Sequence, residues 1–453
     1  MTVQPVTTTD AFLSGNYAPV ADEITVDELV VEGNVPPALS GSYLRAGPNP
    51  LGDPPQPYHW FIGDGMLHNV GLADGRASYR NRWVRTASIA DRLGEAPVDG
   101  PPQPLYDSSN TNVISFAGRI LSLTEGTYPY EVSPDLETVR RFGFDGTLPH
   151  GLTAHPKVDP VTGELHAFSY WFEEPYLIYH VVDANGRLRV TEPMTLPAPV
   201  SMHDFAFTRN HVLFFDQPAV FDLELLGTRG FPVAWKPENG ARVGVLPSGG
   251  TDADARWFET ELGYTFHPMN GHDNDDGTIE IVLPLISSVF GDPQAVHDEL
   301  ARQSLQRWIV DPIGEKVHQE IIDETPQDFC RINERHLGSR NRYGYTTAIG
   351  AEMLYDDTRV FKHDFVGGTR EDHDFGPGRH PGEMLFIADP ERSTEEDGGW
   401  LLGLVHDDAL DRTSLVVLDA QRVGDAPIAQ VHVPRRIPYG FHGTWVADTG
   451  ARR

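Results

Sequence analysis

The sequence predicts an all-β protein, and three observations lead to that class. Short apolar segments rich in β-branched and aromatic residues recur along the 453 residues. Turn signals separate these segments, since the chain holds 44 glycines and 37 prolines spread along its length. No long stretch repeats its apolar residues at the 3.6-residue period of a helix. We therefore expect many short antiparallel strands.

Eight segments carry the strand pattern most clearly. In chain order they are RILSLTEG at 119–126, ELHAFSYW at 164–171, HVLFFDQP at 211–218, GTIEIVLP at 277–284, RYGYTTAIG at 342–350, EMLFIADP at 383–390, WLLGLVHD at 400–407 and SLVVLDA at 414–420. Turn sequences with the spacing of successive hairpins are DPVTGEL at 159–165, DANGRL at 183–188 and DNDDGT at 273–278. Two short helices are expected in connections, at 87–96 and 292–303.

A chain with this many short strands needs an architecture that protects the edges of its sheets. Radial repetition into propeller blades does so at this length, although no Trp-Asp or kelch repeat is visible. No linker rich in serine, glycine or proline divides the chain into halves. We therefore expect residues 1–453 to form a single propeller domain.

The overall charge excludes some classes of partner. Asp and Glu total 66 against 35 Lys and Arg, which gives a formal charge of −31 and a surface that repels nucleic acid. The N-terminal sequence lacks the basic and apolar regions of a signal peptide, and no apolar run approaches the roughly 18 residues of a membrane span. These features predict a cytoplasmic protein.

Cysteine and histidine usage restricts the kind of metal site that the chain can form. The single cysteine, Cys330, excludes a thiolate cluster, so a metal would be held by imidazole and carboxylate groups. We expect Cys330 itself to be a small buried apolar residue rather than a redox group. The 19 histidines supply enough imidazole for such a site.

Four histidines stand directly beside predicted strands. They are His155 in GLTAHPK, His203 in SMHDFAFT, His267 in YTFHPMNG and His442 in YGFHGTW. They are too far apart to share one helix, but a propeller brings the inner strands of several blades to a common axis, where four histidines could meet at one metal. The alternative is that each is an ordinary, partly buried histidine bonded to a carbonyl. Spacing alone does not decide between the two.

The sequence motifs around these histidines resemble those of the carotenoid cleavage oxygenase family, which includes apocarotenoid and stilbene-cleaving dioxygenases. The matching segments are GSYLRAGPNP, YHWFIGDGMLH, YRNRWVRT, NTNVISFAGRILSLTEG, GLTAHPKVDPVTGELHAF, SMHDFAFT, FHPMNG, RINERHLGSRNRYGY, GEMLFIADP and PYGFHGTWV. They follow one another in the right order and cover almost the whole chain.

The resemblance implies a seven-bladed β-propeller with a cap of loops and short helices over one Fe(II) on the axis. The positions similar to the family's iron ligands are His155, His203, His267 and His442. The implied reaction uses O₂ to cleave a conjugated C=C bond to two carbonyl products. Thr111 matches a threonine whose methyl group crowds the sixth coordination position; the alternative is an ordinary strand threonine.

Family members also place carboxylates behind the ligands, and the matching residues here are Glu125, Asp328 and Glu383. Such a carboxylate accepts the outer ring N–H of a metal-bound histidine and fixes its orientation. Asp328 departs from the family pattern, which has Glu, and its reach is shorter by about 1.5 Å, one carbon–carbon bond. We expect either a closer backbone or a bridging water.

The substrate class depends on one position. Relatives that cleave hydroxystilbenes have a lysine directly before the first carboxylate, whereas this chain has Thr124. These relatives also have a phenol-binding tyrosine near the segment YRNRWVRT, where this chain has Trp83. Without the cation an apocarotenoid is favoured, so the expected partners are O₂ and a lipophilic or aromatic alkene. The alternatives are a phenylpropenoid or stilbene-like alkene, and an inactive propeller binding protein.

Three other features are interpreted as structural. The DNDDG sequence at 273–277 lacks the later glutamate of a calcium loop and is expected to be a hairpin turn. His363, His373 and His380 are expected in a solvated loop. The apolar run at 221–235 is expected to be a buried loop that packs on a blade, with at most weak peripheral membrane contact.

Overall fold

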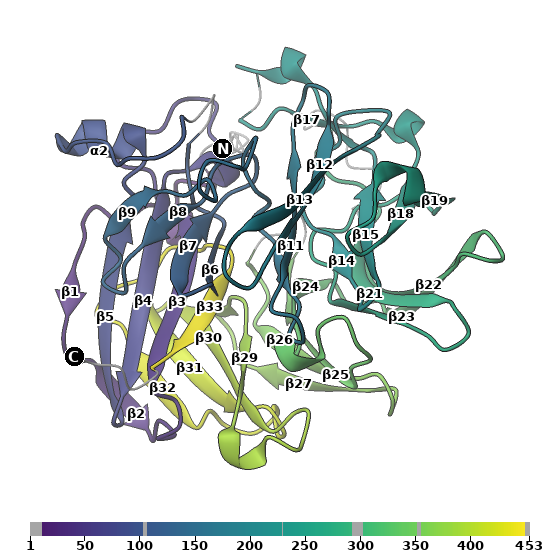
Figure 1. The fold of residues 1–453 in the computed structure, drawn as a ribbon. Helices are drawn as coiled ribbons and strands as arrows, with labels where there is room; N and C mark the ends of the chain where they lie inside the picture. The colour runs from purple at the N-terminus through teal and green to yellow at the C-terminus, as the bar shows by residue number, and fades with distance from the viewer. Residues whose placement is uncertain (1–10, 103–106, 229, 292–301, 351–354, 449–453) are drawn as a thin grey trace, which may run out of the picture.

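In the described residues the chain folds into a ring of seven antiparallel sheets of four to six strands. Figure 1 shows how these sheets are arranged in the computed structural model. The structure describes residues 11–102, 107–228, 230–291, 302–350 and 355–448. Both the all-β class and the seven-bladed propeller are therefore confirmed.

The blades follow the chain in order. Blade 1 has β1 (Thr25–Val26), β3 (Gly41–Pro48), β4 (Gly65–Ala73), β5 (Arg76–Trp83) and β33 (Gly443–Ala447), blade 2 has β6 (Asn112–Phe116), β7 (Arg119–Leu123), β8 (Tyr130–Val132) and β9 (Thr138–Arg141), and blade 3 has β10 (Lys157–Val158), β11 (Leu165–Tyr170), β12 (Leu177–Val182) and β13 (Leu188–Met194). Blade 4 has β14 (Ala206–Phe207), β15 (His211–Asp216), β18 (Arg242–Pro247) and β19 (Arg256–Glu259), and blade 5 has β20 (Asn270–Asp273), β21 (Ile279–Ile286), β22 (Gln303–Asp311) and β23 (Lys316–Asp323). Blade 6 has β24 (Gln327–Arg331), β25 (Tyr343–Ala348), β26 (Arg359–Asp364) and β27 (Thr369–Asp374), and blade 7 has β2 (Val30–Gly33), β28 (Arg379–Pro381), β29 (Leu385–Ala388), β30 (Gly399–Asp407), β31 (Arg412–Asp419) and β32 (Ala429–His432).

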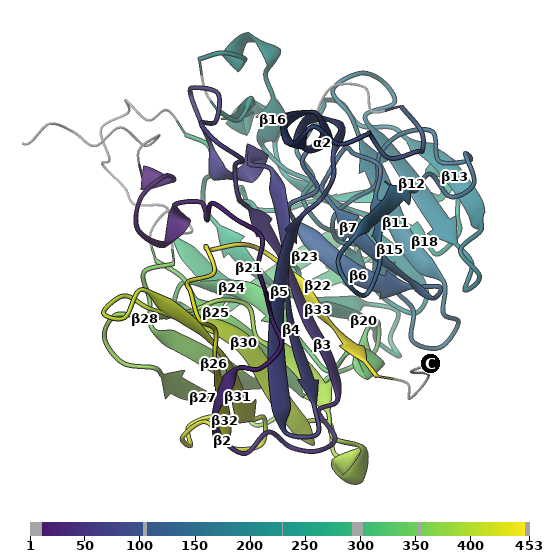
Figure 2. The ribbon, with the colours of Figure 1, turned by 90° about the vertical axis from the view of Figure 1, so that its left-hand side faces the viewer.

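The two ends of the chain close the ring. The last strand, β33, pairs with β3 of the first blade, so that Gly443 lies opposite Arg45 and Trp445 opposite Tyr43. Near the other end of the chain, β2 pairs with β32 of blade 7. Figure 2 shows β33 running beside β3 and β2 lying next to β31 and β32. Strands from the two ends of the chain thereby complete blades 1 and 7.

The core lies between neighbouring blades. Every residue of β11 and β12 is buried, whereas the outer strand β13 alternates between half-buried and exposed side chains. Blade 3 meets blade 4 through aromatic contacts, with ring centroids of Phe168 and Phe205 at 5.5 Å and of Tyr179 and Phe214 at 5.9 Å. Packing on both faces explains why the sequence shows continuous apolar runs rather than strict alternation.

The predicted turns and one of the predicted helices are confirmed. The turn sequences at 159–165, 183–188 and 273–278 connect β10 to β11, β12 to β13 and β20 to β21. The helix α2 (Ala87–Leu93) begins after Thr86, whose hydroxyl accepts the Ile89 N–H, and ends at Gly94, whose φ of +71° suits glycine. The second expected helix, at 292–303, lies almost wholly outside the described residues, and Gln303 begins β22.

The expected solvated loop around three histidines is wrong. His363 lies in β26 and His373 in β27, both buried, and His380 lies in β28. His363 Nε2 is 2.6 Å from Gln327 Oε1 and His373 Nδ1 is 2.9 Å from the Val423 carbonyl oxygen. The sequence does not show the apolar alternation of a strand here, because this hairpin has charged residues on its exposed side and polar residues on its buried side. The buried polar groups have hydrogen-bond partners.

The apolar run at 221–235 is only in part a buried loop. It contributes to a hairpin of β16 (Ala219–Phe221) and β17 (Val233–Trp235) joined through the 3-10 helix η3 (Leu223–Leu225). Phe221 and Trp235 pack beside Tyr264, but Leu223 and Leu226 are 47% and 59% exposed. No helix in the described part of the chain is both long and apolar enough to cross a membrane.

Truncation of the core between blades 7 and 1 should destabilise the ring. Leu415 on β31 is fully buried with Tyr43 and Tyr79, so we expect Leu415→Ala to lower the free energy of unfolding by about 2–5 kcal/mol, as for other buried leucines. The matched control is Leu410→Ala in the turn before β31, where Leu410 is 66% exposed. Urea denaturation of both variants tests this, and equal stabilities would contradict it.

Candidate metal centre

Every blade contributes one predicted site residue from the start of its inner strand. These residues are Thr111 before β6, His155 before β10, His203 before β14, His267 before β20, Asp328 in β24, Glu383 between β28 and β29, and His442 before β33. Only Glu125 comes from elsewhere, the loop that follows β7. Residues spread over most of the sequence therefore meet where the inner strands of the propeller begin.

The four histidines form one cluster. A ring nitrogen from each of His155, His203, His267 and His442 lies within 4.8 Å of the others. His203 Nε2 is 3.0 Å from His155 Nε2 and 3.0 Å from His267 Nε2. These distances bring the nitrogens as close as ligands around one ion, and four imidazoles are a donor set that suits a transition metal.

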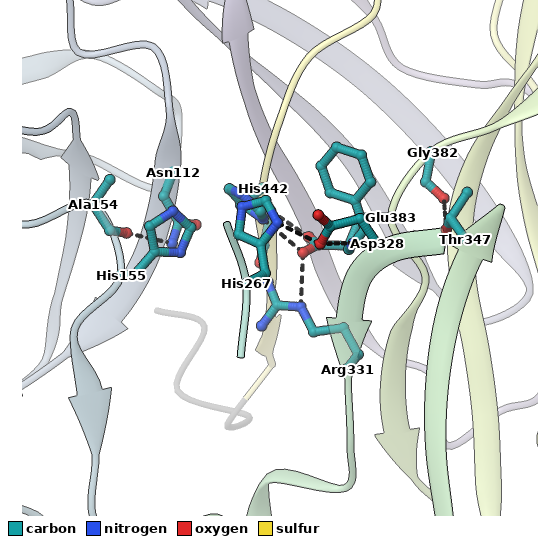
Figure 3. Close-up of polar contacts among 12 residues, drawn as sticks. Asn112, Ala154, His155, His267, Asp328, Arg331, Thr347, Gly382, Glu383 and His442 are labelled. Atoms are coloured by element: carbon teal, nitrogen blue, oxygen red, sulfur yellow. Dashed lines mark hydrogen bonds and ion pairs between the residues drawn. The ribbon is translucent and has the colours of Figure 1, made fainter. Parts of the chain in front are cut away.

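Carboxylates hold the outer nitrogens of three of these rings. The Nδ1 atoms of His203, His267 and His442 lie 2.6, 2.7 and 2.8 Å from oxygens of Glu125, Asp328 and Glu383 respectively. Figure 3 shows the bonds of His267 and His442 on one side of the cluster and His155 opposite. The Nδ1 atoms of His267 and His442 are hydrogen-bonded to carboxylates and His203 Nδ1 is paired with Glu125, so the Nε2 lone pairs are left facing the centre.

Asp328 reaches its histidine directly, although it is shorter than the family's usual Glu. The register of β24 against β25 shifts between Asp328 and Arg331, and Phe329 has a φ of +53°, so the backbone bulges at this point. The Phe329 N–H donates to Asp328 Oδ1 at 2.7 Å, and the Phe329 ring stacks on His267 at 5.5 Å. Of the two expected routes, a closer backbone is therefore the one observed.

Glu383 has the most complete set of partners. Its Oε1 accepts bonds from His442 Nδ1 at 2.8 Å and Arg331 Nε at 2.9 Å, and its Oε2 accepts the Gly443 N–H at 2.9 Å. Burial alone would raise the pKa of this carboxyl, but the Arg331 and His442 partners lower it to about 2. Thr347 Oγ1 donates to the Gly382 carbonyl at 2.8 Å and so supports the same loop (Figure 3).

Burial favours the neutral form of most of the cluster. It lowers the pKa of His155 well below the usual value, lowers that of His267 to about 4 against the pull of Asp328, and lowers that of His442 against the pull of Glu383. His203 differs, because Glu125 outweighs the effect of burial and raises its pKa. Cys330, predicted to be buried, is half-buried and packs beside Met269 and Ile332, and burial raises the pKa of its thiol.

Thr111 and Thr124 share one hydroxyl network beside the cluster. Their Oγ1 atoms are 2.8 Å apart, and both bond to Asn110 Oδ1, at 2.9 and 2.7 Å. The Thr111 carbonyl also accepts the His442 N–H at 3.0 Å. The other position considered for phenol binding is elsewhere: Trp83 is buried beside Ile89 and donates its Nε1–H to the Asn49 carbonyl.

An aromatic wall lies beside the cluster. Phe266 lies 5.3 Å from the His203 ring, and Phe61 of the 3-10 helix η2 (Trp60–Ile62) bridges Phe266 at 6.5 Å and Phe441 at 5.7 Å, measured between ring centroids. None of these rings was predicted from the sequence to be part of the site. The available signal was the aromatic residue directly before His267 and before His442; nothing in the sequence placed Phe61 beside them.

Comparison with known proteins agrees with this geometry. The family model described as retinal pigment epithelial membrane protein matches residues 17–447. A carotenoid cleavage oxygenase from Mycobacterium tuberculosis is 37% identical over 99% of this chain and 100% of its own length. The chain belongs to the carotenoid cleavage oxygenase family.

Three solved structures extend the comparison within the carotenoid cleavage oxygenase family. The lignostilbene dioxygenase of Pseudomonas brassicacearum has a TM-score of 0.88 and 27% identity, covering 96% of this chain and 98% of the other. The Synechocystis apocarotenoid oxygenase, in a variant form, has a TM-score of 0.84 and 27% identity with the same coverage. A cobalt-substituted form of the Synechocystis protein is similar as well, with a TM-score of 0.82.

Glu383→Gln should weaken metal binding. The amide keeps the size of the side chain but loses the charge that orients His442, so we expect metal affinity to fall by about 10–100-fold. The matched control is Glu334→Gln, because Glu334 also pairs with Arg331, at 3.3 Å, but is solvent-exposed. Metal titration against a competing chelator measures both, and an equal loss in the two variants would contradict the role of Glu383.

Proposed function

We propose that this protein is an Fe(II) dioxygenase that cleaves a conjugated C=C bond of an apocarotenoid to two carbonyl products. The observation that carries the proposal is the cluster of four imidazoles, three of them held by carboxylates, beside an aromatic wall. Family membership supports the oxygenase class, since the relatives compared above are named as carotenoid cleavage, apocarotenoid and lignostilbene oxygenases.

The donor set supports iron as the metal. His155, His203, His267 and His442 would hold it, and four neutral imidazoles leave its positive charge uncompensated by a directly bound anion. The existence of a cobalt-substituted form of the Synechocystis protein supports a metal centre in this fold. When bound, Fe(II) supplies the redox chemistry by which O₂ reacts with an alkene.

The protein's own residues orient the site and keep it dry. Glu125, Asp328 and Glu383 hold the outer nitrogens of three imidazole rings. The engaged hydroxyl of Thr111 supports the family role, in which its methyl group crowds a coordination position. Phe61, Phe266, Phe329 and Phe441 offer apolar surface to a hydrocarbon chain and exclude water from it.

Thr124 favours an apocarotenoid over a hydroxystilbene. Its hydroxyl bonds to Asn110 and Thr111, and it provides no cation for a phenolate. The solved relatives include both kinds of oxygenase. The direct bond of Asp328 to His267 argues against the alternative of an inactive binding protein, which rested on that substitution.

The remaining expectations stay proposals. We propose that residues 1–453 form one domain. Its expected partners are O₂ and a lipophilic alkene, and we do not expect it to bind nucleic acid. The exposed Leu223 and Leu226 support at most weak peripheral membrane contact. The cytoplasmic location stays a prediction.

Loss of a ligand should remove metal and activity together. We expect His203→Ala and His442→Ala, purified after expression with added iron, to hold less than about a tenth of the wild-type iron, since metal-bound histidines are not readily replaced. The control is His432→Ala at the surface, whose described partners are Ser414 and Glu32. Elemental analysis measures the result, and full iron in both ligand variants would refute the metal centre.

A substrate panel tests the proposed class. With iron-loaded protein we expect apocarotenoid cleavage to exceed 4-hydroxystilbene cleavage by at least about tenfold in kcat/KM, which corresponds to about 1.4 kcal/mol. The physical reason is the apolar wall combined with the uncharged Thr124. Chromatography of the aldehyde products measures both rates, and the reverse preference would favour the phenylpropenoid alternative.

A further inference from the structure

The four histidines of the cluster differ in how their outer ring nitrogens are held. Three Nδ1 atoms have a carboxylate oxygen at 2.6–2.8 Å. Among the described residues, the carboxylate nearest to His155 Nδ1 is Asp204, whose Oδ2 lies 3.9 Å away, too far for a hydrogen bond. His155 thus has a carboxylate beside it that it does not use.

Lys157 accounts for this gap. Asp204 is 2% exposed, and both of its oxygens lie 2.9 Å from Lys157 Nζ. Its Oδ1 also accepts the Phe205 N–H at 2.7 Å. The buried carboxylate is therefore neutralised and held by a lysine rather than by the neighbouring imidazole.

The pair joins two ligand-bearing segments. Lys157 follows His155 by two residues and begins β10 of blade 3, and Asp204 follows His203 directly, before β14 of blade 4. On the other side of His155, Asn112 Nδ2 of blade 2 donates to the Ala154 carbonyl at 2.7 Å (Figure 3). The His155 segment is thus fixed from both neighbouring blades without a carboxylate bonded to its ring.

We propose that Lys157 and Asp204 are a positioning pair that makes His155 the weakest electron donor of the four ligands. This inference rests on the metal centre proposed above. A carboxylate that accepts the Nδ1–H of a ligand raises the basicity of that ligand. Lys157 withholds Asp204 from such a bond, so three imidazoles bind as strengthened donors and His155 does not.

A second buried pair in the chain provides the comparison for a purely structural role. Lys362 Nζ on β26 of blade 6 lies 2.7 Å from Asp397 Oδ2, and both side chains are largely buried. The described partners of this pair, Gln421 and the Tyr343 ring, include no histidine. Removal of Lys362 should therefore cost stability without altering the metal centre.

The experiment uses the full chain, stripped of metal and reconstituted with cobalt(II), whose visible absorption bands report the strength of its ligands. In Lys157→Met, Asp204 is free to accept the His155 Nδ1–H, so we expect shifted bands and about tenfold tighter cobalt binding. Lys157→Arg, which keeps the cation, should retain the wild-type bands. The double variant Lys157→Met/Asp204→Asn should return to them, because the competing carboxylate is gone.

Lys362→Met is the matched control and should lower the melting temperature while leaving the bands unchanged. Wild-type bands and affinity in Lys157→Met would overturn the positioning pair while leaving the metal centre intact. The same band shift in Lys362→Met would also overturn it, since the effect would then be general destabilisation. Failure of the wild-type protein to bind cobalt would overturn the proposed metal centre together with the pair.

A measurement on the wild-type protein tests the inference even if Lys157→Met does not fold. In the cobalt-substituted protein, the ring N–H protons of the ligands give strongly shifted NMR signals. We expect one of the four to exchange with D₂O at least about tenfold faster than the others, because only His155 has its nearest carboxylate oxygen beyond hydrogen-bonding distance of Nδ1. Equal exchange of all four signals would overturn the proposal.

Discussion

The pairing of β33 with β3 is the constraint on which the rest of the structure depends. It joins the C-terminal end of the chain to the first blade and sets Gly443 opposite Arg45. His442 directly precedes this pairing, and its N–H is held by the Thr111 carbonyl of blade 2. If the ring were open at this point, the site would lack His442, which is the fourth histidine and the partner of Glu383, and it would also lack the aromatic ring of Phe441. Fold and site are therefore completed by the same hydrogen bonds.

Charge pairing fixes the cluster once the ring is closed. A carboxylate buried without a partner costs several kcal/mol, and the imidazoles and Arg331 that face Glu125, Asp328 and Glu383 offset that cost. The same bonds leave the inner nitrogens of the rings free for a metal. The protein's own carboxylates thus orient three of the four ligands.

Polar and apolar groups are separated around the cluster. Carboxylates, Arg331 and the Lys157 and Asp204 pair lie behind the imidazoles, whereas Phe61, Phe266 and Phe441 lie beside them. A hydrocarbon substrate would therefore meet an apolar wall on one side and the oriented ligands on the other. This division fits a reaction that adds both atoms of O₂ to an alkene and requires water to be excluded.

The sequence by itself determined the strands and the candidate ligands, because short apolar runs, turn residues and histidines beside strands are local features. Family resemblance added the number of blades and the three carboxylates. Only the tertiary structure decided how Asp328 reaches His267, that Phe61 lies beside the cluster, that His363 and His373 are buried, and that Asp204 bonds to Lys157 rather than to His155. The physical reason is that each of these depends on contacts between residues far apart in the chain, which exist only after the seven blades pack into a closed ring.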